Sequence, residues 1–207
     1  MKFEKEYFDN HYGDVRARNP ERKLSFLLQS IKRFKEKGKL LDIGFGYGSF
    51  LRYAGNAFAV YGLDNSEYTV NTIKQHIKNI KKGSAEKLPF KQDFFDVVTA
   101  FDVLEHVPAL DTAFLECKRV LKKGGIFMIV VPVYDGISGP FIRALDKDRT
   151  HLHKRTRRFW IKKIQEHGFT LLECGGIFRY LFMQHYFHIP TKNLRNHAPA
   201  LYLVCKK

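Results

Sequence analysis

Apolar and polar positions follow two different periods along this chain. Short apolar runs bounded by Gly or Asp predict strands at residues 39–45, 57–64, 94–102, 126–133, 170–178 and 200–207. Apolar residues spaced three or four positions apart predict helices at residues 48–56, 66–82, 110–125 and 157–168. Ser66 and Thr156 stand where a helix N-cap is expected.

Strands that alternate with helices predict an α/β fold built from βαβ units around a mainly parallel sheet. Residues 96–101 and 127–133 are apolar almost throughout, which is typical of strands buried on both faces. Right-handed crossovers would then give an open, doubly wound, Rossmann-like sheet with helices on both faces. The ligand crevice of such a sheet lies at the carboxyl ends of its strands.

Composition places the chain among ordinary globular proteins of one domain. It has 207 residues, of which 44% are apolar. The three cysteines, Cys117, Cys174 and Cys205, are far apart, which argues against a disulfide framework and favours a cytoplasmic protein. We expect no signal peptide, because the first residues lack an apolar segment, and no span of a bilayer by the short run at residues 126–133.

The charge is high and uneven. The net charge is +15, from 36 basic and 21 acidic residues. Basic residues gather at residues 74–82 and 143–163. Such a surface attracts nucleic acid, an anionic membrane surface or an acidic small molecule, but it is also consistent with a solvated face that has no partner. No RNA-binding motif accompanies it, so the charge does not identify a partner.

A glycine-rich turn follows the first predicted strand. Gly44, Gly46 and Gly48 have the spacing G-x-G-x-G, and the third glycine of a dinucleotide fingerprint would fall at Ser49. Asp64 ends the second predicted strand, where a carboxylate can bind the two hydroxyls of a ribose. An N-cap role for Asp64 is the alternative, although Ser66 suits it better. The residues up to this point leave NAD and S-adenosylmethionine both open.

The segments that follow resemble the class I methyltransferases that use S-adenosylmethionine. The chain carries, in order, "LDIGFGYG", "GLDNS", "GSAEKLPF", "FDVVTAFDVLEHV" and "LKKGGIFMIVVP". This resemblance, strongest to the type 11/12 group that acts on small molecules and lipids, implies seven strands with the last one antiparallel. It implies S-adenosylmethionine as methyl donor and S-adenosylhomocysteine as product. It divides a single domain into an N-terminal helical lid (1–38), a cofactor-binding core (40–132) and a substrate-side half (133–207) with an insertion at 177–198.

The resemblance also implies roles for individual residues. The implied cofactor-binding residues are Asp42, Gly44, Gly46, Gly48, Asp64, Asn65, Ala85, Glu86, Phe101, Asp102 and His106. Asp64 would hold the ribose hydroxyls, while Phe101, Asp102 and His106 would border the sulfonium and amino acid end. The family often has Asp where this chain has Ser84, so the contact to the adenine amino group departs from the usual one.

The candidate catalytic residues lie in the segment after the fifth predicted strand. Asp148, Thr150, His151 and Thr156 resemble a D-x-T-H-x-x-x-x-T segment of the same group. His151 could act as a general base or substrate ligand oriented by Asp148; alternatively, these residues only fix the loop and Thr156 caps the next helix. His151, His153 and Asp148 lack a clear further ligand, so no metal site is predicted.

The expected activity is methyl transfer to a small molecule that is quinone-like, a lipid or linked to a sugar. The alternatives are an RNA methyltransferase that uses the basic face, a cofactor-binding partner subunit without turnover, and a dehydrogenase that binds NADH. Two aromatic segments could shape the acceptor pocket, and the second could instead rest on a membrane or be a hairpin or a dimer contact. They contain Tyr7, Phe8, His11 and Tyr12, and Phe178, Tyr180, Phe182, Met183, Tyr186 and Phe187.

Overall fold

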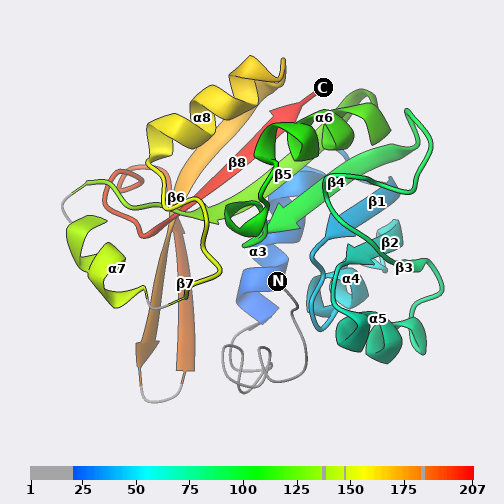
Figure 1. Ribbon diagram of the computed structural model, residues 1–207, viewed down its shortest axis with the longest axis horizontal. Helices are drawn as coiled ribbons and strands as arrows, with labels where there is room; N and C mark the ends of the chain where they lie inside the picture. The colour runs from blue at the N-terminus through cyan, green and yellow to red at the C-terminus, as the bar shows by residue number, and fades with distance from the viewer. Residues whose placement is uncertain (1–20, 137–138, 147, 183–184) are drawn as a thin grey trace.

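The fold is an eight-stranded sheet flanked by helices (Figure 1). The computed structural model describes residues 21–136, 139–146, 148–182 and 185–207. The strands run in the order β3-β2-β1-β4-β5-β8-β6-β7. Their bounds are β1 Gly38–Ile43, β2 Phe58–Asp64, β3 Ile80–Lys82, β4 Phe95–Phe101, β5 Leu121–Pro132, β6 Thr170–Phe182, β7 His185–Thr191 and β8 Ala200–Lys206.

Strand directions confirm the predicted doubly wound sheet. The neighbours β3, β2, β1, β4 and β5 pair in parallel, and β8 is antiparallel to both β5 and β6. The order reverses between β1 and β4, which opens a crevice at the carboxyl ends of these strands.

The structure has one strand more than the predicted seven, because the expected insertion at 177–198 forms a hairpin. β6 continues past Ile177, where its pairing with β8 ends, and β7 returns along it from the Phe182↔His185 pair to the Gly176↔Thr191 pair. The segment therefore forms a hairpin, and the predicted acceptor-pocket, membrane or dimer roles of its aromatic residues stay predictions. The side chains of Tyr180, Phe182, Met183, Tyr186 and Phe187 lie outside what the structure describes.

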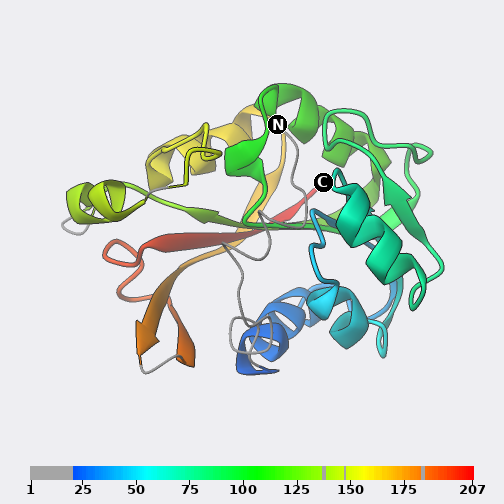
Figure 2. The same cartoon turned by 60° about the horizontal axis from the view of Figure 1, so that its bottom comes forward.

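Helices cover both faces of the sheet (Figure 2). Two apolar clusters, one on each face, explain this arrangement. One cluster joins the sheet to α3, α4 and α5, and the other joins it to η1, α6 and α8. The adjacent residues Val97 and Val98 of β4 belong to different clusters, as a strand buried on both faces requires. The helix bounds are α3 Glu21–Lys32, α4 Ser49–Ala54, α5 Glu67–Lys74, η1 Leu104–His106, α6 Leu110–Val120, α7 Gly139–Leu145 and α8 Arg157–Glu166.

Two predicted helices are too long. The helix expected over residues 66–82 ends at Lys74, and Ile80–Lys82 forms β3, because Ile80 is buried where it pairs with Gly62 of β2. The helix expected over residues 110–125 ends at Val120, where Leu121 joins β5. Sheet pairing therefore overrides the helical periodicity at both ends.

Both predicted caps are confirmed. The side chain of Ser66 accepts a hydrogen bond from Thr69 N, and that of Thr156 accepts one from Phe159 N. Residues 1–20, with Tyr7, Phe8, His11 and Tyr12, lie outside the described residues, so the predicted lid stays a prediction. None of the helices in the described part of the chain is long and apolar enough to cross a membrane.

A candidate cofactor and active site

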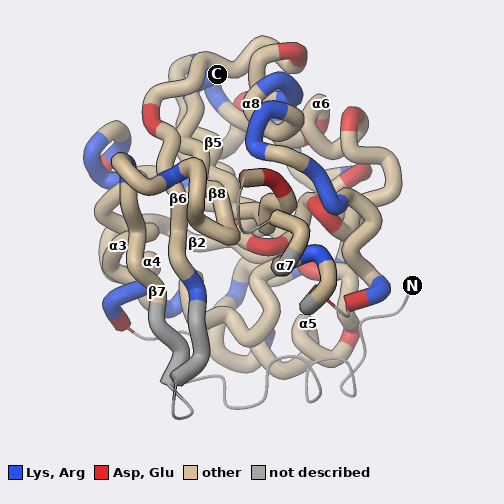
Figure 3. The backbone as a smooth tube through the Cα atoms, turned by 90° about the vertical axis from the view of Figure 1, so that its left-hand side faces the viewer, with Lys and Arg blue, Asp and Glu red and all other residues tan. Residues whose placement is uncertain are grey.

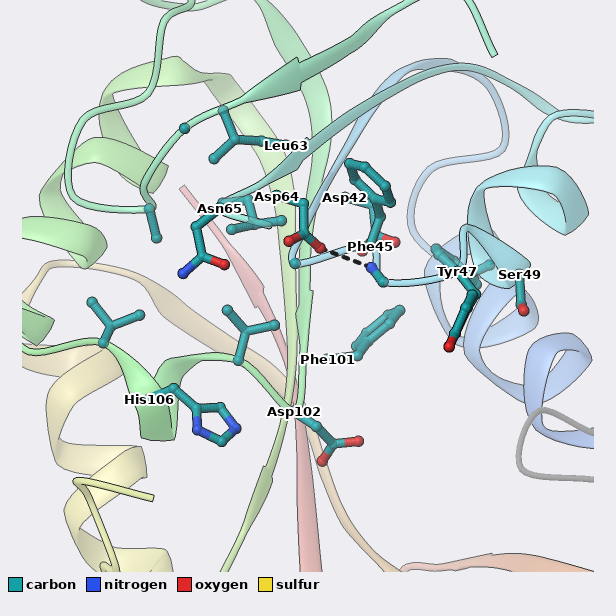
Figure 4. A pocket seen from close by; sticks show the side chains of 18 of the residues that line it. Asp42, Phe45, Tyr47, Ser49, Leu63, Asp64, Asn65, Phe101, Asp102 and His106 are labelled. Atoms are coloured by element: carbon teal, nitrogen blue, oxygen red, sulfur yellow. Dashed lines mark hydrogen bonds between the residues drawn. The ribbon is translucent and has the colours of Figure 1, made fainter. Parts of the chain in front are cut away.

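A cavity of about 200 Å³ opens at the carboxyl ends of β1, β2 and β4 (Figure 4). It lies where strand order reverses, as the fold class predicts. Residues of α3, the glycine turn, the ends of β2 and β4, and η1 line it. Its polar side chains include Lys23, Asp42, Asp64, Asn65, Ser84, Asp102 and His106.

Close packing and left-handed backbone angles explain why the glycine turn has no side chains at these positions. Gly44 has φ 69°, and a Cβ there would lie 2.3 Å from Cγ2 of Val103. Gly48, the N-cap of α4, has φ 68°, and its Cβ would lie 3.2 Å from Cγ2 of Ile73. L-residues with side chains rarely adopt this left-handed conformation. The glycines thus shape the turn itself, and only Gly44 and Gly46 line the cavity.

Asp64 fixes the position of that turn. Its Oδ2 accepts a hydrogen bond from Gly46 N at 2.9 Å, drawn as the dashed line in Figure 4, and its Oδ1 accepts one from Ser66 N at 2.9 Å. Burial raises the pKa of this carboxyl despite these bonds. Each oxygen retains capacity for a further donor, because a carboxylate offers about four lone-pair sites.

Asp42 is the second buried acid of the cavity. Its Oδ1 accepts a hydrogen bond from the Thr99 hydroxyl at 2.6 Å. Burial raises its pKa to about 7, and the nearby Asp64 adds to that shift. A buried carboxyl with this pKa is poised to ionise when a cationic group binds beside it.

Asp102 lies at the end of β4 in a conformation that only a few residue types tolerate. It has φ 57°, and its Oδ1 pairs with Nη1 of Arg179 of β6 at 2.7 Å. Burial acts to raise its pKa, but Arg179 and Lys23 together hold the pKa below its usual value. Asp102 is therefore ionised inside a partly apolar pocket.

The segment after β3 forms another part of the wall. Ser84 and Ala85 line the cavity, whereas Glu86 does not. Glu86 binds the start of α6 through a hydrogen bond from Ala109 N at 2.7 Å, and its other oxygen accepts one from the Ser84 hydroxyl at 3.1 Å. Of the predicted cofactor residues, all line the cavity except Gly48 and Glu86.

The predicted catalytic segment packs onto η1. The amides of Leu152 and His153 donate to the carbonyl of Glu105, and Nδ1 of His106 lies 3.1 Å from the carbonyl of Thr150. Nδ1 also lies 2.8 Å from the Thr150 hydroxyl. Because that hydroxyl donates to Asp148 Oδ1 and the carbonyl only accepts, we assign the proton of these contacts to Nδ1 of His106. Burial, together with His151, lowers the pKa of His106, which keeps its ring neutral near pH 7.

His151 lies directly behind His106, with the ring centroids 4.7 Å apart. Its Nδ1 is 2.8 Å from Oδ2 of Asp146 and 3.1 Å from the hydroxyl of Tyr134. Asp146 rather than Asp148 makes the hydrogen bond to His151: Asp148 Oδ2 lies 3.8 Å from Nε2 of His151, within ion-pair distance, and its Oδ1 accepts from the amide and hydroxyl of Thr150. His151 is not among the residues that line the cavity, whereas His106 is.

Glu105 is a site residue that the sequence did not single out. Its side chain is 1% exposed, and its Oε2 has no hydrogen-bond partner among the described residues. Burial, reinforced by Asp102, raises the pKa of this carboxyl well above its usual value. The available signal was a second acid in the turn "DVLEHV", but sequence does not tell which acid points inward.

The residues of the cavity fit S-adenosylmethionine better than a dinucleotide. Three carboxylates, Asp42, Asp64 and Asp102, line a pocket in a protein of net charge +15. A sulfonium and an ammonium would be attracted to them, whereas a pyrophosphate would be repelled. The Gly46 amide, which a pyrophosphate would need, already donates to Asp64.

The acidic site lies on a doubly wound α/β sheet whose strand β8 is antiparallel to its neighbours. Residues 41–129, somewhat less than half of the chain, match the family model described as a methyltransferase domain. This match supports a class I S-adenosylmethionine-dependent methyltransferase.

Curated relatives share only part of their length with the chain. It is 26% identical over 131 residues to a sterol 24-C-methyltransferase of Debaryomyces hansenii, covering 58% of the chain and 35% of that protein. It is 34% identical over 106 residues to the demethylmenaquinone methyltransferase of Bacillus subtilis, covering 46% of each. The chain thus spans about a third to a half of the length of these relatives.

Solved structures share the fold over nearly the whole chain. One is a SAM-dependent methyltransferase from Thermotoga maritima, with a TM-score of 0.73 and 19% identity. The alignment covers 98% of this chain and 97% of that one. At this identity the likeness establishes the fold alone.

Proposed function

We propose that this protein transfers the methyl group of S-adenosylmethionine to a small, largely apolar acceptor. The observation that carries this proposal is the acidic cavity at the ends of β1, β2 and β4. In this proposal Asp64 binds the ribose hydroxyls and Asp42 binds the amino group of the donor. Ser84, in place of the usual acid, would contact the adenine edge.

The protein must align the reacting atoms of donor and acceptor, because the methyl donor is already activated. A nucleophilic atom of the acceptor attacks the methyl carbon, the carbon–sulfur bond breaks, and S-adenosylhomocysteine leaves as a neutral thioether. The sulfonium is already a good leaving group, so the protein mainly holds nucleophile, carbon and sulfur in line. A negative Asp102 would stabilise the cationic donor where it binds.

The apolar residues that line the cavity favour a small apolar acceptor. Leu24 and Leu27 of α3, with Phe50 and Phe101, provide apolar surface there, and His106 stands across the cavity from Tyr47 and Ser49 in Figure 4. The relatives named above act, by their names, on a sterol and on demethylmenaquinone, which are both apolar. We propose His106 as the histidine nearest the acceptor and His151, the predicted catalytic residue, as a positioning residue behind it.

RNA is the less favoured acceptor. Figure 3 shows Lys and Arg concentrated along α8 and the segment leading to it. Several of these cations already have acidic partners: Lys154 pairs with Asp146, Arg157 with Asp135 and Lys163 with Asp111. Much of the basic segment thus serves the fold, which supports the solvated-face interpretation.

Calorimetric titration with S-adenosylhomocysteine, with NADH as the comparison ligand, tests the cofactor. We expect binding of the former only. Asp64→Ala should weaken it by about 2–4 kcal/mol, the value of one or two hydrogen bonds to a charged group. Glu36→Gln is the control, because Glu36 is exposed and lies just before the amino end of β1, away from the cavity. NADH binding, or unchanged affinity in Asp64→Ala, would contradict the assignment.

Turnover separates an enzyme from a cofactor-binding partner subunit. Wild-type protein should convert S-adenosylmethionine to S-adenosylhomocysteine when quinone-like and sterol acceptors are screened, and His151→Ala should lower this rate more than it lowers donor affinity. Donor binding without turnover on any acceptor class, RNA included, would favour the partner-subunit alternative.

A further inference from the structure

Three potential metal ligands meet where the 146–156 loop packs on η1. One ligand atom from each of Glu105, His106 and His151 lies within 4.8 Å of the other two. Two imidazoles and a carboxylate form a donor set that suits divalent first-row transition ions. The sequence could not reveal it, because His151 is far along the chain from the other two.

The rings of His106 and His151 both use Nδ1 for hydrogen bonds, so Nε2 is the nitrogen that could bind a metal ion. Nδ1 of His151 bonds to Asp146, and Nδ1 of His106 donates to the carbonyl of Thr150. In neutral rings this assigns the lone pair to Nε2 of each. Such outer contacts, from a carboxylate and from a backbone carbonyl, are those that orient histidines in metal sites.

Glu105 supplies a buried carboxyl that a bound cation would hold in its ionised form. Its Oε2 is buried and has no hydrogen-bond partner among the described residues, and its Oε1 is 4.0 Å from Nε2 of His106. Asp146 and Asp102 already pair with Lys154 and Arg179. An unpartnered buried carboxyl is costly, and a bound cation would remove that cost.

We propose that Glu105, His106 and His151 bind one divalent transition-metal ion, such as Zn²⁺ or Mn²⁺, at the wall of the cavity. Asp146 is a positioning residue, which acts through His151. Of the three ligands only His106 lines the cavity, so the ion would lie behind the cavity wall, and its binding does not depend on the proposed methyl transfer.

Metal binding is measured on the whole chain, stripped with a chelator and free of methyl donor. Zn²⁺ is titrated in competition with a chromophoric chelator, and Mn²⁺ by the loss of its free electron paramagnetic signal. We expect one tight equivalent. Mg²⁺ should bind far more weakly, because it prefers oxygen ligands alone.

Four variants test the site: two change proposed ligands, one changes the outer contact and one is a control. Glu105→Gln and His151→Ala should weaken Zn²⁺ binding by more than the roughly 10–100-fold that loss of an outer-shell contact costs, and Asp146→Asn should weaken it by that amount. His76→Ala, an exposed histidine on the segment after α5, should leave it unchanged. Circular dichroism and thermal unfolding of the metal-free variants show whether each still folds.

Zn²⁺ should raise the unfolding temperature of the wild type but not that of Glu105→Gln, which keeps the shape of the buried side chain. No tight equivalent in the wild type, or Zn²⁺ affinity equal in the wild type, Glu105→Gln and His151→Ala, would overturn the proposal. This outcome is independent of the cofactor assignment, which S-adenosylhomocysteine titration tests separately.

Discussion

At the residue scale, the site is a set of buried carboxyls whose pKa values differ because their partners differ. Asp102 has Arg179 and is held ionised, whereas Asp42 has a hydroxyl partner and a neighbouring acid and has a pKa of about 7. Glu105 lacks a hydrogen-bond partner on one oxygen among the described residues, and burial, reinforced by Asp102, raises its pKa well above its usual value. Charge at this site therefore depends on what binds there.

Binding of S-adenosylhomocysteine should release a proton from Asp42. At pH 6.5, below the pKa of about 7, this carboxyl is mostly protonated, and the ligand's ammonium favours the ionised form, so about half a proton or more should leave per ligand bound. Calorimetry in buffers of different ionisation enthalpy measures this release.

Asp42→Asn should abolish that release, and Glu36→Gln should retain it. Equal release in the wild type and Asp42→Asn would mean that another group titrates. Raising the pH toward 8.5 should reduce the contribution of Asp42, because the carboxyl is then already ionised in the free protein.

At the element scale, single side chains join segments that are distant in sequence. Asp96 of β4 accepts hydrogen bonds from the amide of Lys39 in β1 and the ammonium of Lys122 in β5, and it pairs with Lys35 after α3. The 146–156 loop is similarly held on η1 through Glu105 O. These contacts position the strands and the loop that carry the cavity residues.

Asp96→Asn should reduce the free energy of unfolding at pH 7 by about 1.5–3 kcal/mol, the value of a hydrogen bond to a charged group. Burial acts to raise the pKa of Asp96, but the Lys39 amide and Lys122 together lower it. Its stabilisation is therefore present above the unfolded pKa of 3.8 and is lost as the pH falls through the lower, folded pKa. Urea unfolding of both proteins at pH 7 and pH 3 measures this, and an equal difference at both would contradict it.

Thr156→Ala should cost about 1 kcal/mol of stability, because it removes the N-cap of α8. Affinity for S-adenosylhomocysteine should not change, since Thr156 does not line the cavity. Thr156→Ser keeps the hydroxyl and should restore most of the loss. A large fall in ligand affinity in Thr156→Ala, with stability retained, would assign Thr156 to the site instead.

At the scale of the whole molecule, a protein of net charge +15 holds an acidic cavity. The basic excess lies on the outside, in part along α8, and is partly paired. The cavity and the outer surface thus attract ligands of opposite charge, and this separation lets the protein select a cationic donor despite its overall charge.

Single-stranded RNA should bind only non-specifically, with a dissociation constant of roughly 1–100 μM at physiological salt and a steep loss of affinity as salt rises. Fluorescence anisotropy over a salt series measures this. Titration of S-adenosylhomocysteine in the same series should show little salt dependence, because its partners are buried. Tight RNA binding that persists at high salt would instead favour the RNA alternative.

The sequence by itself determined most strands of the sheet, the glycine turn and most of the cavity wall. These features depend on local patterns: period-two and period-3.6 apolar spacing, and a glycine turn and an acid at consecutive strand ends. The carboxyl ends of neighbouring parallel strands lie at one edge, so Asp64 could be placed beside the glycine turn from its position alone, whereas the placement of Asp42 and Asp102 came from the family resemblance.

Tertiary structure decided what depends on packing between distant segments. β3 replaced the end of a predicted helix because Ile80 pairs beside Gly62, and Asp146 rather than Asp148 holds His151. The meeting of His151 with Glu105 and His106 arises only when the 146–156 loop packs on η1. Sequence spacing specifies neither a loop's path nor the direction of its side chains, because contacts with the rest of the chain set both.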